Sequence, residues 1–212
     1  MSFDELLQLV SREKRLHICS DSRLVKPGDI FVAVTGTSVD GHDFIEKAVA
    51  SGAKFVVAEK PRRSSGAEVI IVEDSARAAG LLAQAYRGNP ASKLVNLAVT
   101  GTNGKTTVGF LVQAMVKSTG QKCGLIGTVT YDTGEQLIEA NMTTPDCADI
   151  ARMQQEMVKA GAGYMVIEAS SHALSQNRLS GINFKSAAFT NLTGDHLDYH
   201  KTEKDYLAAK AI

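Results

Sequence analysis

The chain has no net charge, few cysteines and no long apolar run, and each absence excludes a class of protein. Its 23 basic residues balance 23 acidic ones, so no overall field favours a nucleic acid or a membrane surface. No apolar run approaches the roughly 20 residues that a membrane-spanning helix needs. Residues 1–15 mix charges with leucines, which predicts an amphipathic helix rather than a signal peptide. We therefore expect a soluble, cytoplasmic protein with small-molecule partners.

The cysteines form neither a disulfide pattern nor a zinc pattern. They are odd in number, lie far apart and lack metal-ligand spacing: Cys19, Cys123 and Cys147. They fit buried thiols in a reducing compartment. A hydrophobic content of 44% is normal for a globular protein, so nothing indicates disorder.

The most informative stretch is the small-residue run Val99-Thr100-Gly101-Thr102-Asn103-Gly104-Lys105-Thr106-Thr107. An apolar run over 94–99 predicts a strand before it, and the spacing of apolar residues over 108–116 predicts a helix after it. At such a turn, glycines let backbone N–H groups surround phosphate oxygens, and the helix N-terminus adds partial positive charge. Lys105 would reach the outer phosphates, and Thr106 would offer its hydroxyl to Mg²⁺. Val99 stands where the general pattern has its first glycine, so an ordinary glycine-rich turn is the alternative.

Strand and helix patterns alternate along the chain and predict two α/β units, residues 1–88 and 89–212. In the first unit we expect strands over 16–19, 29–34, 54–58 and 69–72, and helices over 44–51, with Asp43 as N-cap, and 75–87. In the second we expect strands over 94–99, 123–126, 164–167 and 186–189, a hairpin through Asp132-Thr133-Gly134, and a helix from about Pro145 to Ala160 with Thr144 as N-cap. Ligands gather at the carboxyl ends of strands in doubly wound sheets.

Polar residues follow two of the predicted strands. Glu168 comes directly after 164–167, where its carboxylate could coordinate the Mg²⁺ of a bound nucleotide, or simply cap a helix or face solvent. His196 lies in a polar stretch after 186–189, and a single histidine is more often an ordinary hydrogen-bonding residue than a metal ligand. Ser170-Ser171-His172 suggests a nucleophile beside a base, but adjacent residues rarely face each other and a G-x-S-x-G motif is missing.

Taken together, these motifs resemble the Mur ligases, the ATP-dependent amide-forming family that builds the peptidoglycan stem peptide. The likeness spans nearly the whole chain and is carried by Asp21-Ser22-Arg23 with Val25 to Ala33, Thr100 to Thr107, Thr143-Thr144-Pro145, Glu168 to Leu174, and Phe189 to Leu192 through Asp195 to His200. It is strongest to the MurE type, which adds the third residue to UDP-N-acetylmuramoyl-L-alanyl-D-glutamate. Asp40 to Phe44 with the first segment also resembles the MurF type.

The resemblance implies a small N-terminal UDP-binding domain over 1–88 and a partial P-loop ATPase domain, with a mostly parallel sheet, over 89–212. It places the UDP moiety at Ser20, Ser22, Thr37, Ser38 and Val39. It places the sugar-peptide moiety at Thr143, Thr144, Ser170, Gln176 and Arg178, and ATP at Gly101, Thr102, Asn103, Gly104, Lys105, Thr106 and Thr107. The implied Mg²⁺ ligands are Thr106, Glu168, His196 and, as a carbamate, Lys210. The implied catalytic residues are Lys105, Glu168, His196 and Lys210.

The implied reaction has two steps. ATP phosphorylates the D-glutamate carboxylate, and the amine of a free amino acid attacks the acyl phosphate to give an amide, ADP and phosphate. Relatives continue beyond a sequence like this one with a domain for the added amino acid, so the resemblance implies an inactive fragment of an enzyme that is monomeric when complete. The alternatives are a MurF-type or other ligase of the superfamily, a non-catalytic UDP-sugar or nucleotide-binding module, and an unrelated P-loop phosphotransferase.

Overall fold

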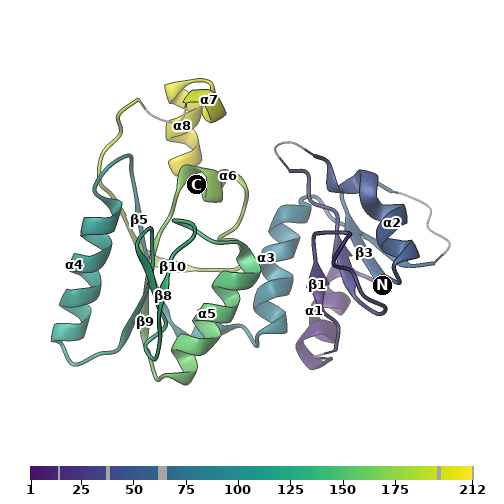
Figure 1. The fold of residues 1–212 in the computed structure, drawn as a ribbon, viewed down its shortest axis with the longest axis horizontal. Coiled ribbons are helices and arrows are strands. Elements are labelled where there is room, and N and C mark those ends of the chain that lie inside the picture. The colour runs from purple at the N-terminus through teal and green to yellow at the C-terminus, as the bar shows by residue number, and fades with distance from the viewer. Residues whose placement is uncertain (14, 37–38, 62–65, 195–196, 212) are drawn as a thin grey trace. The chain divides into compact units, whose positions relative to one another are not determined.

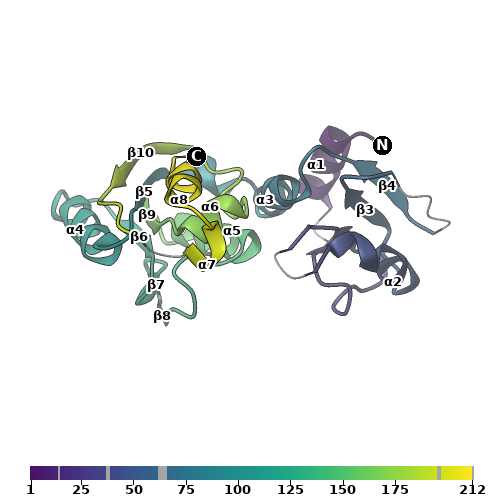
Figure 2. The same cartoon turned by 90° about the horizontal axis from the view of Figure 1, so that it is seen from above.

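The computed structural model describes residues 1–13, 15–36, 39–61, 66–194 and 197–211. The chain divides into two compact units, Met1–Gly88 and Asn89–Ile212. Each unit has helices layered on a sheet, as the alternating strand and helix patterns predict (Figure 1 and Figure 2). In these described ranges, no helix combines the length and the hydropathy that crossing a membrane requires.

Unit 1 is built on a parallel sheet. Its strands pair in the order β1 (Ile18–Cys19), β2 (Ile30–Val32), β3 (Phe55–Ala58) and β4 (Glu68–Ile71). Helices α1 (Phe3–Arg12) and α3 (Ser75–Tyr86) pack together on one face, and α2 (Ile45–Ala50) packs on the other (Figure 2). Strands β2 and β3 are buried along their whole length because helices cover both faces of the sheet.

The start of the predicted 44–51 helix differs from expectation. A 3₁₀ turn, η1 (Gly41–Phe44), precedes α2, and Asp40 caps this turn by accepting the His42 N–H at 3.0 Å. Asp40 has the extended backbone that an N-cap requires, whereas Asp43 already lies inside the turn. The prediction of Asp43 as the N-cap is therefore wrong.

Unit 2 has a mostly parallel sheet in the order β10-β5-β9-β6-β7-β8. The parallel strands are β10 (Phe184–Phe189), β5 (Val95–Thr100), β9 (Tyr164–Glu168) and β6 (Cys123–Ile126). Strands β7 (Thr130–Asp132) and β8 (Leu137–Glu139) continue the sheet antiparallel. The hairpin predicted through Asp132-Thr133-Gly134 is confirmed.

Helices α4 (Lys105–Ser118) and α5 (Cys147–Lys159) cover opposite faces of this sheet (Figure 1). Along β9, Met165 and Ile167 belong to the core on the α5 side, and Val166 belongs to the core on the α4 side. Helix α4 begins at Lys105, earlier than predicted, because the glycine-rich loop leads directly into its first turn. The packed face of α4 carries Val108, Val112 and Val116, while Phe110, Leu111 and Met115 are exposed.

Helix α5 begins after Asp146 rather than after Thr144. The Asp146 carboxylate accepts the Asp149 N–H at 2.9 Å, which is the cap of the helix. Thr144 is buried, and its hydroxyl donates to the backbone carbonyl of Glu168 at 2.7 Å. The prediction of Thr144 as the N-cap is wrong because this hydroxyl bonds across the sheet edge instead. The remaining short elements are η2 (Pro90–Lys93), α6 (Ser171–Ser175), α7 (Leu197–His200) and α8 (Glu203–Lys210).

Candidate functional site

The loop between β5 and α4 has the geometry of an anion-binding turn. Gly104 occupies the N-cap position of α4 with φ +84°, and it has no side chain to accept the first N–H groups of the helix. By contrast, helix α1 is capped by the Ser2 side chain and helix α3 by the Asp74 side chain. The N-terminus of α4 therefore presents N–H donors and a positive dipole end that suit a phosphate.

The segment after β10 holds this loop in place. The Thr102 N–H donates to the backbone carbonyl of Asn191 at 2.9 Å, and the Asn103 N–H donates to the Asn191 side chain at 3.0 Å. The Thr190 hydroxyl donates to the Asn103 carbonyl at 2.7 Å. A Cβ at Gly101, where φ is +134°, would lie 2.0 Å from the Thr190 hydroxyl oxygen, so only glycine fits there. Sequence reasoning gave Thr190 and Asn191 no role, although their place directly after a strand was a usable signal.

Two lysines converge on the same loop carbonyl. The Lys105 ammonium donates to the carbonyls of Gly101 and Thr102, both at 2.9 Å. The Lys210 ammonium donates to Gly101 at 2.9 Å and lies 4.5 Å from the ring centre of Tyr206. Lys210 is only 5% exposed, so it is not the solvated helix lysine that its sequence context alone suggests. The structure thus brings Lys105 and Lys210 together at the loop between β5 and α4, residues 101–104, which we call the phosphate loop.

Glu168 ends β9 as a buried carboxylate, 1% exposed, beside the first turn of α4. One carboxylate oxygen accepts the Thr106 hydroxyl at 2.9 Å and the Thr128 hydroxyl at 3.0 Å, and the other accepts the Thr128 N–H at 3.0 Å. The alternatives of a surface glutamate and a helix cap are therefore wrong. A buried carboxylate needs such donors or a cation to offset its lost hydration.

The Thr106 and Glu168 oxygens suit Mg²⁺, which prefers hard oxygen ligands and is usually held by one or two carboxylates together with substrate phosphates. Across the described ranges, no group of three or more His, Cys, Asp or Glu side chains could hold a metal by itself. A nucleotide phosphate would complete the donor set of Thr106 and Glu168. His196, the further ligand that the resemblance implies, lies outside the described residues.

The residues expected to hold the sugar-peptide moiety form a hydrogen-bonded cluster beside Glu168. The Ser170 N–H donates to the Thr144 hydroxyl oxygen at 3.0 Å, and the two hydroxyl oxygens lie 3.1 Å apart. The Arg178 guanidinium donates to the Thr144 carbonyl at 2.8 Å and to the Gln176 side-chain oxygen at 2.6 and 3.0 Å. The fifth member, Thr143, joins through Thr128, since their hydroxyl oxygens are 3.1 Å apart. This prearranged set can present hydroxyl and guanidinium donors to a carboxylate.

The Ser-His pairing that the sequence suggests does not form. The Ser171 hydroxyl is buried and has no hydrogen-bond partner within the described ranges. The His172 ring instead lies against Tyr199, with ring centres 4.1 Å apart. Discounting a hydrolase nucleophile is thus consistent with the geometry.

In unit 1, a cavity of about 420 Å³ opens at the carboxyl ends of β1 and β2 and is lined by Ser20, Asp21, Ser22, Arg23, Val34, Val39, Gly41, Phe44 and Lys47. It brings together Ser20, Ser22 and Val39, three of the residues expected at the UDP moiety. The other two, Thr37 and Ser38, lie outside the described residues.

The polar groups of this cavity suit an anion. Ser22 is only 5% exposed and lines the cavity. Hydrogen bonds from the Arg23 side chain and N–H lower the pKa of Asp21 to about 2, so this carboxylate is ionised and paired. With Asp21 and Arg23 neutralising each other, Lys47 leaves the cavity wall with a net positive charge.

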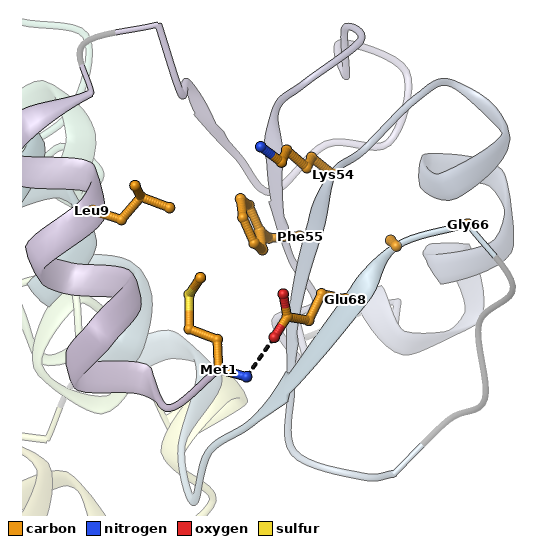
Figure 3. A pocket seen from close by; sticks show the side chains of 7 residues that line it. Met1, Leu9, Lys54, Phe55, Gly66 and Glu68 are labelled. Carbon is orange, nitrogen blue, oxygen red and sulfur yellow. Dashed lines mark hydrogen bonds and ion pairs between the residues drawn. The ribbon is translucent and has the colours of Figure 1, made fainter.

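A different cavity, of about 510 Å³, lies at the amino ends of β3 and β4 and is lined by Met1, Leu9, Lys54, Phe55, Gly66, Ala67 and Glu68 (Figure 3). The amino group of Met1 and the Glu68 carboxylate form an ion pair across it (Figure 3). None of the predicted site residues lines this cavity. In a parallel sheet, ligands bind at the opposite, carboxyl edge.

Comparison with known proteins agrees with this geometry. The family model described as "Mur ligase middle domain" matches residues 99–212, and the one described as "Mur ligase family, catalytic domain" matches residues 16–87. The chain belongs to the Mur ligase family, and the resemblance seen in its motifs is confirmed.

Two similar proteins and one solved structure carry the same name. A UDP-N-acetylmuramoyl-L-alanyl-D-glutamate–2,6-diaminopimelate ligase of Geobacillus kaustophilus is 46% identical over 192 residues, covering 91% of this chain and 39% of that protein. The enzyme of that name from Aquifex aeolicus is also 46% identical, covering 92% of this chain and 40% of its own length. A solved structure bearing this name has a TM-score of 0.74 at 32% identity and covers 92% of this chain and 40% of that one. The chain thus spans about two fifths of the length of these relatives.

Proposed function

We propose that this chain is the acceptor-binding and ATP-binding part of a MurE-type ligase, which adds the third amino acid to UDP-N-acetylmuramoyl-L-alanyl-D-glutamate in the cytoplasm. The observation that carries the proposal is the hydrogen bond from Thr106 to the buried Glu168, which places a carboxylate beside an uncapped helix N-terminus. That pairing suits the triphosphate and the divalent cation of ATP. The high identity to the diaminopimelate ligases supports the MurE type over the MurF type.

The chain's own residues would bind and orient the reactants. The N–H groups at the start of α4 would hold the phosphates, and Lys105 would leave the carbonyls of Gly101 and Thr102 to neutralise the transferred group. Mg²⁺, held by Thr106 and Glu168, would supply further neutralisation of phosphate charge. Phosphoryl transfer depends chiefly on positioning and charge stabilisation, so the proposed reaction needs no side-chain nucleophile.

The acceptor would be held at its two ends. We assign its UDP end to the cavity of unit 1, where Ser22 offers a hydroxyl and Lys47 a positive charge. We assign its peptide end to the cluster of Thr143, Thr144 and Arg178 in unit 2. The D-glutamate carboxylate then takes the γ-phosphoryl group of ATP, and a free amino acid displaces phosphate to form the amide.

Calorimetric titration of the chain tests this proposal. We expect it to bind the ATP analogue AMP-PNP with Mg²⁺, and Lys105→Ala to weaken that binding roughly 10- to 150-fold, as expected from losing charged hydrogen bonds of about 1.5–3 kcal/mol. Lys204→Ala, an exposed substitution on α8, is the matched control and should bind normally. A Lys105→Ala protein that binds the analogue as well as the unsubstituted chain would contradict the proposal.

A further inference from the structure

We propose that Thr128 is a positioning residue, whose single hydroxyl ties the Glu168 carboxylate to the acceptor residue Thr143. The inference rests on the proposed function, because that function gives Glu168 its role toward the metal and Thr143 its role toward the acceptor. Thr128 lies in the turn between β6 and β7, far in sequence from both partners. No motif of the phosphate loop or of the acceptor cluster includes it.

Thr128 contacts both oxygens of the Glu168 carboxylate. Its N–H donates to Oε1 at 3.0 Å, and its hydroxyl lies 3.0 Å from Oε2. A carboxylate held at both oxygens by one residue cannot rotate without breaking at least one of these bonds. The N–H bond depends only on the backbone, whereas the hydroxyl bond depends on the side chain, so substitution can remove one and keep the other.

Proton counting gives the hydroxyl chain a direction. An ionised carboxylate only accepts hydrogen bonds, and a threonine hydroxyl has a single proton to donate. The Thr128 hydroxyl is the donor toward two acceptors, Oε2 of Glu168 at 3.0 Å and the Thr143 hydroxyl oxygen at 3.1 Å, and its one proton links these two groups. Because Thr143 accepts in its bond with Thr128, it keeps its own proton to donate to a ligand.

The backbone around Thr128 is fitted to the carboxylate. A Cβ at Gly127 would lie 2.3 Å from Oε1 of Glu168, so only glycine allows this approach. The Gly127 N–H donates to the Thr130 carbonyl at 3.2 Å, which closes the turn. On the other side, Thr144 donates to the backbone carbonyl of Glu168 at 2.7 Å. The neighbouring residues Thr143 and Thr144 are thus tied to Glu168 by separate routes. Thr144 bonds to the backbone of Glu168, and Thr143 reaches its carboxylate through Thr128.

Loss of the Thr128 hydroxyl should therefore affect the binding of both the metal ion and the acceptor. Thr128→Val keeps the shape and the N–H bond but removes the hydroxyl from Oε2 and from Thr143. Groups that orient a metal ligand typically change metal affinity 10- to 100-fold when removed. We expect Thr128→Val to weaken Mn²⁺ binding to the AMP-PNP complex about tenfold. We also expect weaker binding of UDP-N-acetylmuramoyl-L-alanyl-D-glutamate, whereas Thr128→Ser, which keeps the hydroxyl, should bind both as the unsubstituted chain does.

The matched control is Thr130→Val. Thr130 lies in the adjoining strand β7, and its hydroxyl donates to the Ile138 carbonyl at 3.0 Å, away from Glu168. This variant loses a threonine hydroxyl of the same segment and should keep normal Mn²⁺ affinity. Binding of AMP-PNP in EDTA should be equal in all the variants, because metal-free binding does not involve the carboxylate.

The experiment measures Mn²⁺ binding by electron paramagnetic resonance and acceptor binding by calorimetry on the 212-residue chain. Weaker Mn²⁺ and acceptor binding in Thr128→Val would support the inference, provided that Thr128→Ser and Thr130→Val both bind normally. Thr128→Ala serves in the same comparison where the valine variant does not fold. Normal Mn²⁺ affinity in a folded variant without the hydroxyl would overturn the inference alone. An unsubstituted chain that binds neither AMP-PNP nor the acceptor would overturn the proposed function as well.

Discussion

The Thr106 hydroxyl donates to the Glu168 carboxylate over 2.9 Å, which joins the first turn of α4 to the carboxyl end of β9. These residues are 62 positions apart and meet because β5, which leads into the phosphate loop, pairs in parallel with β9. The parallel register puts Val99 opposite Glu168. The end of β9 and the beginning of the phosphate loop therefore lie at the same edge of the sheet. The phosphate loop and the carboxylate are therefore parts of one site.

Removing the Thr106 hydroxyl should raise the Mg²⁺ requirement. We expect Thr106→Val to need about tenfold more Mg²⁺ for AMP-PNP binding, because a metal-side oxygen is lost. Thr106→Ser should restore the affinity. The control is Thr119→Val, since the Thr119 hydroxyl only donates to the Val116 carbonyl at the end of α4. Calorimetry at several Mg²⁺ concentrations measures this, and an unchanged requirement in Thr106→Val would remove Thr106 from the metal site.

The cavity of unit 1 should respond to Ser22 alone. Ser22→Ala removes a hydroxyl that lines the cavity, so UDP should bind roughly 2- to 12-fold more weakly, as expected for a net 0.5–1.5 kcal/mol hydrogen bond. AMP-PNP binding should not change. Ser11→Ala is the matched control, because that hydroxyl bonds within α1. Equal loss of UDP and AMP-PNP binding in Ser22→Ala would mean a general folding defect and not a local contact.

Asp132 should make the stability of unit 2 depend on pH. Burial pushes its pKa upward, but hydrogen bonds from Lys117, the Gly134 N–H and Gln113 outweigh burial and hold the pKa below its usual value. The folded pKa is thus lower than the unfolded one. The stabilisation is present above the unfolded pKa, about 3.9, and is lost as pH falls through the folded pKa.

Asp132→Asn should therefore lower the thermal midpoint at pH 7 and reduce its decline between pH 5 and pH 3. Asp149→Asn, at an exposed carboxylate on α5, is the control and should leave the decline in place. Thermal unfolding followed by circular dichroism gives both values. An equally steep decline in Asp132→Asn would show that other carboxylates cause it.

We expect the side-chain nitrogen of Lys210 to carry a carbamate in the active protein. Its buried nitrogen lies at the phosphate loop, where an anion could help to hold Mg²⁺ and an ammonium would repel it. A neutral amine bonds to the carbon of CO₂ and releases one proton, which leaves the anionic group. With ¹³C-bicarbonate, we expect one carbamate NMR signal that Lys210→Ala removes and Lys204→Ala keeps. A spectrum without the signal under these conditions would refute the carbamate.

Local rules predicted most of the fold. The glycine-rich turn, the alternating patterns and the Asp132-Thr133-Gly134 hairpin depend on neighbours in sequence, and the structure has them. The predictions of the N-caps failed because two side chains near each helix start could serve as the cap. Asp40 and Asp146 cap the turns, and the nearby Asp43 and Thr144 do not.

The residues that hold the site in place were missed, because their contacts depend on the pairing of strands that are far apart in sequence. Thr128, Thr190 and Asn191 reach the phosphate loop or Glu168 only because β6 and β10 occupy particular places in the sheet order. A sequence pattern identifies strands but does not fix their order, so these contacts could not be derived from it. The burial of Lys210 likewise follows from α8 packing beside the loop, which its polar sequence context does not indicate.

The most direct test of the account is the acceptor preference of the chain. Calorimetry in the presence of Mg²⁺ and AMP-PNP would compare UDP-N-acetylmuramoyl-L-alanine, UDP-N-acetylmuramoyl-L-alanyl-D-glutamate and the corresponding tripeptide. A MurE-type acceptor site predicts that the dipeptide form binds most tightly, because its terminal carboxylate is the group to be phosphorylated. Tighter binding of the tripeptide form, or equal binding of all three, would contradict the proposed reaction.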